Sequence, residues 1–197
     1  MKKKLHIVIG VLLYGILLEA SNIKQIEPFG IKLNQPLNKS IVFKDISDSD
    51  MIIIDNPPKP VSLFTLYGAS LNKFKKVTTV VGVGKTYKDD DYCFSSKADF
   101  TKIENILTKK YGSPSKNSDY LFYDSIWKDS KDYKMSFVKN ERSHFTSWDA
   151  IPEYPNIKIY LEESADRTGC FVKLVYKDKQ LNLEQTKEQE KSDINSF

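Results

Sequence analysis

Apolar and polar residues alternate along much of this chain, with the period of two that is typical of β-strands that bury one face. The alternation is clearest in Lys75–Tyr87, Asn156–Glu162 and Cys170–Lys177. Antiparallel sheets commonly bury a single face, so the pattern predicts an antiparallel sheet of about five to seven strands. The other strand candidates are Ile41–Phe43, Met51–Ile54, Val61–Tyr67, Tyr120–Trp127 and Tyr133–Val138.

One segment has helical spacing instead. Its apolar residues recur three or four positions apart, and Gly112 and Pro114 follow it as typical stop signals. Ser96–Asp99 resembles a capping box at its start. These features predict one main helix over about residues 99–111, with an apolar stripe that packs on one face of the sheet. The expected fold class is therefore α+β.

The start of the chain has a different pattern, in which lysines precede a long apolar run. Lys2–Lys4 are followed by Leu5–Leu18, and polarity returns at Glu19 before the small residue Ala20. The run is shorter than the roughly 20 residues that span a bilayer, so a membrane anchor is the alternative and not the prediction. We predict a signal peptide at residues 1–20, and hence a periplasmic or secreted protein with no stable membrane span after its removal.

The remainder of the 197-residue chain is long enough for one domain with a substantial core. We place this domain at residues 26–180. Residues 181–197 are rich in Gln, Glu, Lys, Asn and Ser, which predicts a flexible polar tail or a frayed helix.

Charge argues against one class of partner. The chain has a formal net charge of +4, and the predicted leader contributes three lysines and one glutamate to it. Lysines elsewhere are interspersed with acidic residues, so no basic patch is expected. We therefore expect no binding to nucleic acid, and a protein or another envelope component as the partner.

Two cysteines, Cys93 and Cys170, are present. An even pair of cysteines in an oxidising compartment predicts a disulfide, which would join the start of the main helix to the last strand. A metal site is not expected, because His144 is the only histidine after the predicted leader and no Cys-x-x-Cys spacing occurs.

No recognisable catalytic or cofactor motif is found in the sequence. Gly82–Thr86 resembles the end of a P-loop, but Thr79 stands where that motif has its first glycine, and turn residues follow where a helix is needed. Neighbouring acids at Glu162, Glu163 and Asp166 leave carboxylate chemistry open. We expect no catalytic, cofactor or metal residues, while whether the chain is an enzyme stays open.

The segment Asn140–Pro155 is predicted to be a long loop, and loops of this length often carry function. It contains Trp148 and Tyr154, and aromatic residues are frequent anchors of protein interfaces. This segment is therefore the candidate partner-binding loop.

Phe29–Leu37 and Leu107–Pro114 resemble stretches of small exported bacterial α+β proteins, many of them uncharacterised. The resemblance implies an exported α+β domain and supplies no catalytic residues. The function expected is that of an exported, non-enzymatic binding protein of the bacterial envelope, of the inhibitor, immunity or accessory type. The alternatives are a secreted hydrolase that uses carboxylate or Tyr residues and a secreted host-directed factor.

Overall fold

The computed structural model describes residues 25–38, 40, 42–45, 51–88, 90–149 and 151–194. The predicted signal peptide at residues 1–20 lies outside the described residues. Within the described part of the chain, no helix is both long enough and apolar enough to cross a membrane.

The described strands form one antiparallel sheet of eight strands in the order β1-β2-β3-β4-β8-β7-β6-β5. Their bounds are β1 Val42–Asp45, β2 Met51–Ile54, β3 Phe64–Leu71, β4 Val77–Gly84, β5 Lys116–Leu121, β6 Arg142–Trp148, β7 Ile157–Ala165 and β8 Cys170–Asp178. The predicted α+β class, with an antiparallel sheet and a main helix packed on it, is confirmed. The sheet has at least one strand more than the sequence predicted.

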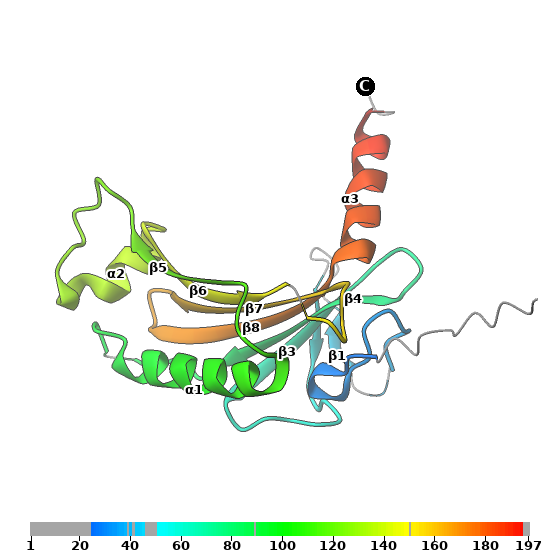
Figure 1. The fold of residues 1–197 in the computed structure, drawn as a ribbon, viewed down its shortest axis with the longest axis horizontal. Coiled ribbons are helices and arrows are strands. Elements are labelled where there is room, and N and C mark those ends of the chain that lie inside the picture. The colour runs from blue at the N-terminus through cyan, green and yellow to red at the C-terminus, as the bar shows by residue number, and fades with distance from the viewer. Residues whose placement is uncertain are drawn as a thin grey trace, which may run out of the picture.

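Helix α1, Phe94–Tyr111, lies along one face of the sheet (Figure 1). The short helix α2, Tyr133–Val138, lies near the end of the sheet where β5 ends and β6 begins, and α3, Lys179–Ile194, projects away from the sheet (Figure 1). The described residues also include the 3₁₀ turns η1 at Pro28–Gly30 and η3 at Ser130–Asp132.

The main core lies between α1 and the sheet. Alternate residues of β7 and β8 are buried, as the sequence pattern requires. At the other side of the core, the Phe29 ring packs edge-on against Phe64 and Tyr67, with centroids 5.2 and 4.9 Å apart. A Cβ added to Gly82 would lie 2.7 Å from the Phe29 ring. Gly82, in the sequence that resembles a P-loop, is therefore explained by the close approach of the Phe29 ring to strand β4.

Several local predictions are wrong. Tyr133–Val138 is helix α2 and not a strand, because Tyr133 and Phe137 are four residues apart and both are buried on the same side. The predicted loop Asn140–Pro155 contains strand β6, and the strand expected at Tyr120–Trp127 ends at Leu121.

The main helix begins five residues earlier than expected. Cys93 is its N-cap, with a left-handed backbone (φ 55°) and no side-chain cap, so the predicted capping box at Ser96–Asp99 is wrong. The polar residues from Lys179 form helix α3 as far as Ile194.

Candidate functional site

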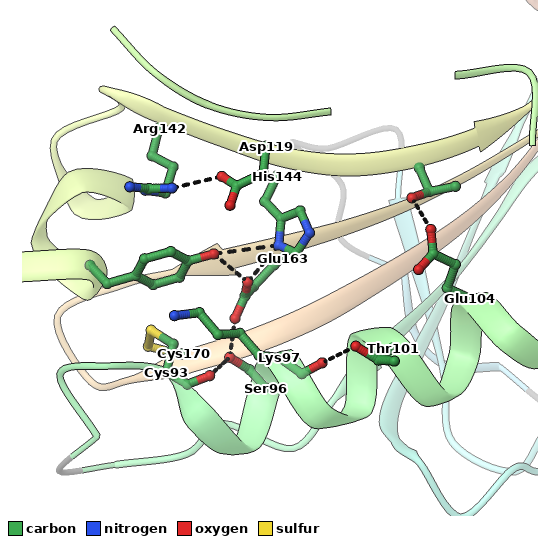
Figure 2. A network of polar contacts seen from close by, with 12 residues as sticks. Cys93, Ser96, Lys97, Thr101, Glu104, Asp119, Arg142, His144, Glu163 and Cys170 are labelled. Carbon is green, nitrogen blue, oxygen red and sulfur yellow. Dashed lines mark hydrogen bonds and ion pairs between the residues drawn. A yellow bond between two sulfur atoms is a disulfide. The ribbon is translucent and has the colours of Figure 1, made fainter. Parts of the chain in front are cut away.

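A buried carboxylate, Glu163 on β7, lies at the centre of a polar cluster between the sheet, α1 and α2 (Figure 2). The Ser96 hydroxyl of α1 donates to Glu163 Oε1 at 2.5 Å. The Tyr133 hydroxyl of α2 donates to Oε2 at 2.9 Å, and His144 Nδ1 of β6 lies 2.8 Å from the same oxygen. We call Glu163, Ser96, Tyr133 and His144 the Glu163 cluster.

Strand register brings this cluster together. His144 pairs directly with Glu163 across β6 and β7, so both side chains lie on the face that α1 covers. The pairing joins residues 19 positions apart in sequence. No local spacing could have predicted it.

Two cations flank the Tyr133 ring. Lys97 Nζ lies 3.2 Å from the ring centroid and the Arg142 guanidinium carbon 4.4 Å from it, within the range of cation–π attraction. Arg142 also donates to Asp119 Oδ1 at 2.7 Å. The charges of Lys97 and Arg142 are thus balanced by Glu163 and Asp119, which leaves little net attraction for an added anion.

The pKa values of Tyr133 and Lys97, both near Glu163, are shifted in the directions that burial dictates. Burial raises the pKa of Tyr133 well above its usual value, and the negative charge of Glu163 raises it further. Tyr133 therefore stays protonated and donates to the carboxylate. Burial lowers the pKa of Lys97, against the opposing attraction of Glu163.

The disulfide Cys93–Cys170 is confirmed, and it lies beside the cluster (Figure 2). Its two Cα atoms are 5.6 Å apart, and both cysteines are fully buried. It ties the N-cap of α1 to the first residue of β8. Ser96 Oγ is also 3.1 Å from the Cys93 carbonyl oxygen, so the covalent link and the polar cluster hold the same first turn of α1.

A second polar contact fastens α1 further along its length. Glu104 Oε1 accepts hydrogen bonds from Thr146 Oγ1 on β6 and Asn117 Nδ2 on β5, both at 2.7 Å. Polar contacts therefore hold α1 to β5 and β6 through Glu104, and to β7 through Ser96.

The three acids that left carboxylate chemistry open are not brought together. Glu162 points to the opposite face from Glu163 and pairs with Lys173. Asp166 lies in the turn after β7, where it accepts hydrogen bonds from the backbone of Thr168 and Gly169. Only Glu163 joins a cluster.

The Glu163 cluster has the carboxylate–histidine contact of many catalytic sites but lacks access to solvent. A carboxylate that contacts Nδ1 of a histidine is the arrangement that orients a general base. The Glu163 side chain, however, is fully inaccessible to solvent and its two oxygens are already occupied. In the geometry observed, the cluster fastens α1 and α2 to the sheet.

An exposed apolar surface lies at the same end of the sheet, where β5 ends. It consists of Tyr120, Phe122, Tyr123 and Ile126, which we call the 120–126 surface. Tyr123 is 98% exposed and Ile126 78%. The rings of Tyr120 and Phe122 stack with centroids 5.6 Å apart. Its sequence signal is the apolar run Tyr120–Trp127, whose composition predicts a strand.

The residues of the predicted partner-binding loop lie elsewhere and are buried. Trp148 is 1% exposed, and its indole nitrogen donates to the Gly112 carbonyl oxygen at 3.0 Å. Tyr154 is also buried and lines a hollow of about 350 Å³ with residues that include Gln25 and Asn156. Strand β6 carries Trp148 into the core, and Tyr154 is buried beyond the end of that strand.

No group of three or more potential metal-ligating side chains is found within the described part of the chain.

Fold and site together define a disulfide-bonded α+β protein with a buried carboxylate cluster and an exposed aromatic surface at one end of its sheet. No protein-family model matches the chain. No curated protein matches it either. Among solved structures, it is similar to the crystal structure of a DUF4309 family protein, YjgB, from Bacillus subtilis subsp. subtilis strain 168. The two are 14% identical, with a TM-score of 0.30, over 74% of this chain and 71% of that one.

Proposed function

We propose that this chain is an exported, non-enzymatic binding protein of the bacterial envelope, and that it binds another protein through the 120–126 surface. The observation that carries the proposal is the exposure of four large apolar side chains within seven residues. Contiguous exposed apolar side chains are costly in water and are common at protein interfaces. Tyrosine is also among the residues that supply most of the binding energy at such interfaces.

The surroundings of this surface suit a binding role. It begins on β5 and continues into the segment before α2, and the Arg142–Asp119 pair and the Glu163 cluster hold the elements on either side of it. Because packed elements hold both ends of the segment, it loses less conformational freedom when a partner binds than an unanchored segment would.

Export is supported by two independent features. The first 20 residues have the order of a signal peptide. The Cys93–Cys170 bond is of a kind that forms and persists in oxidising compartments. Together they favour a location outside the cytosol.

Site-specific photo-crosslinking in the native host tests the proposal. A photoreactive amino acid is placed at Tyr123, at Ile126 or, as a matched control, at Phe74. Phe74 is also strongly exposed, at 68%, but lies in the β3–β4 turn at the opposite end of the sheet. We expect one discrete crosslinked protein from positions 123 and 126 and none from position 74. Equal crosslinking at all three positions, or at none, would refute the proposal.

A hydrolase is the second candidate, and the contact of Glu163 with His144 and Tyr133 is the observation that favours it. If the chain were such an enzyme, His144→Gln would abolish hydrolysis while leaving folding intact. A panel of chromogenic ester and glycoside substrates provides the assay. Activity that survives this substitution would show that the Glu163 cluster is not its source, and absence of activity from the unaltered chain argues for the binding role.

A further inference from the structure

Strand β5 is an edge of the sheet, since it pairs with β6 on one side only among the described strands. In an antiparallel ladder, alternate residues direct their N–H and C=O groups to the neighbouring strand, and the residues between them direct these groups outward. The Phe122 N–H donates to the Glu141 carbonyl oxygen at 2.8 Å, and this bond sets the alternation. Residues 118 and 120 therefore bond to β6, whereas Asn117, Asp119 and Leu121 present their backbone groups outward.

These outward groups have no hydrogen-bond partner among the residues that the structure describes. Natural sheets commonly protect such an edge with charged side chains, proline or a covering segment. On β5 the Asp119 carboxylate is bonded to Arg142 of the neighbouring strand, so Lys116 is the charged side chain without an ion pair on this edge among the described residues. The Asn117 side chain is likewise bonded to Glu104 of α1. Both side chains are exposed but bonded to neighbouring elements, and no described segment hydrogen-bonds to the outer side of this edge.

The 120–126 surface continues this edge. Tyr120 pairs with Ser143 and lies on the face opposite to Asp119, with the Phe122 ring stacked beside it. A strand added to β5 would place every second side chain beside these rings. The edge thus fits an extended segment whose alternate residues are apolar.

Charge favours a different protein over a second copy of this chain. Asp119 is paired with Arg142, but no ion pair of Lys116 is found among the described residues. A partner with an acidic residue near Lys116 would supply the missing charge. In the symmetric pairing of two copies centred on Asp119, two carboxylates would lie opposite each other, which is unfavourable, and Lys116 would still lack an acid.

We infer that the partner of this protein binds by adding an extended segment to the free edge of β5, with apolar alternate residues over the 120–126 surface and an acidic residue beside Lys116. This inference rests on the proposed function and specifies how the partner is held. Main-chain hydrogen bonds give affinity in this mode, and the side-chain contacts give specificity.

Amide hydrogen exchange of the full chain tests the edge itself, with the protein captured by crosslinking at Tyr123 as the probe. In the free protein, the amides of residues 118 and 120 are expected to exchange slowly, and those of 117, 119 and 121 rapidly. On addition of the captured protein, the three fast amides should become protected. Protection confined to residues 122–126 would overturn the inference and leave the proposed function standing. Failure to capture any protein at Tyr123 would instead count against the proposed function.

A matched pair of variants tests the same point by affinity. Asp119→Ala and Asp119→Pro both remove the contact with Arg142, but only proline also removes the outward N–H. We expect the proline variant to bind the captured protein at least about tenfold more weakly than the alanine variant, because it also blocks the added strand. Equal thermal stability of the two variants would show that the fold is retained. Equal affinity, or a dimer of the unaltered chain by analytical ultracentrifugation, would overturn the inference.

Discussion

Reduction of the Cys93–Cys170 bond is the most quantitative test of how this fold is stabilised. The two cysteines are 77 residues apart in sequence, so the bond closes a long loop in the unfolded chain. For a loop of this length, the chain-entropy relation gives about 4.5 kcal/mol at 25 °C. In a domain of this size, that free energy corresponds to a decrease of about 9 to 18 °C in melting temperature.

Urea unfolding with and without a phosphine reductant measures this free energy. Because both sulfurs are fully buried, reduction has to be carried out on the unfolded chain before refolding. The reduced protein is expected to show a lower free energy of unfolding and a steeper dependence on urea, since its unfolded chain is free to expand. The double variant Cys93→Ala/Cys170→Ala is the control, and its unfolding should not respond to the reductant.

The loss of stability on reduction tests whether the bond acts by restricting the unfolded chain. If the reduced protein has two titratable thiols and yet loses less than about 1 kcal/mol, the bond does not restrict the unfolded chain as the entropy relation requires. The stability at this end of the sheet would then come from the Glu163 cluster and the packing of α1, and not from the covalent link.

Three further predictions address single side chains. Glu163→Ala should lower the free energy of unfolding by about 3 to 5 kcal/mol in urea, because it leaves buried donors unpaired, whereas Glu162→Ala on the opposite face should cost less than about 1 kcal/mol. Trp148→Ala should cost about 3 to 5 kcal/mol in the same assay, and an unchanged midpoint would show that the ring is not part of the core. The hydrogen bond to Asp99 raises the pKa of Tyr87 to about 12 from 10.0, so its contribution to stability is complete below pH 10 and is lost as the pH rises towards 12. The difference in phenol absorbance between the unaltered chain and Tyr87→Phe locates this titration, and a midpoint near pH 10 would contradict it.

The sequence predicted strands correctly where the two faces of a strand differ in hydrophobicity. In β7, Ile159 and Leu161 face α1 while Lys158 and Glu162 face away, so periodicity alone predicted the strand. The disulfide likewise followed from the cysteine count and the predicted compartment.

Strand β6 was missed for a physical reason. Its residues that face α1 include His144 and Thr146, which are polar because they bond to Glu163 and Glu104. The alternation in hydrophobicity is therefore absent from this strand, and only Trp148 remains as an apolar inward residue. A strand whose buried side is satisfied by hydrogen bonds looks like a loop in the sequence.

The Glu163 cluster could not be predicted either, because its residues are polar and are distant from one another in sequence. Its members come from four elements, and their meeting depends on strand register and on the placement of α2. The start of α1 was also hidden, because Cys93 at the N-cap makes no side-chain cap and Asp90, three residues before it, accepts from the Ser95 N–H instead. Local sequence contains no signal for either feature.

The strand order has a consequence for how the chain acquires its fold. β8 is the last strand in the sequence, but it lies between β4 and β7 in the sheet. Until residues 170–178 have been synthesised, β1–β4 and β5–β7 have no strand to join them, and each group presents an unpaired edge. Pairing between parts so distant in sequence also makes folding slow. A chain that emerges N-terminus first therefore passes through most of its synthesis without a complete sheet, and the final joining of the two groups comes with almost the last segment of the domain.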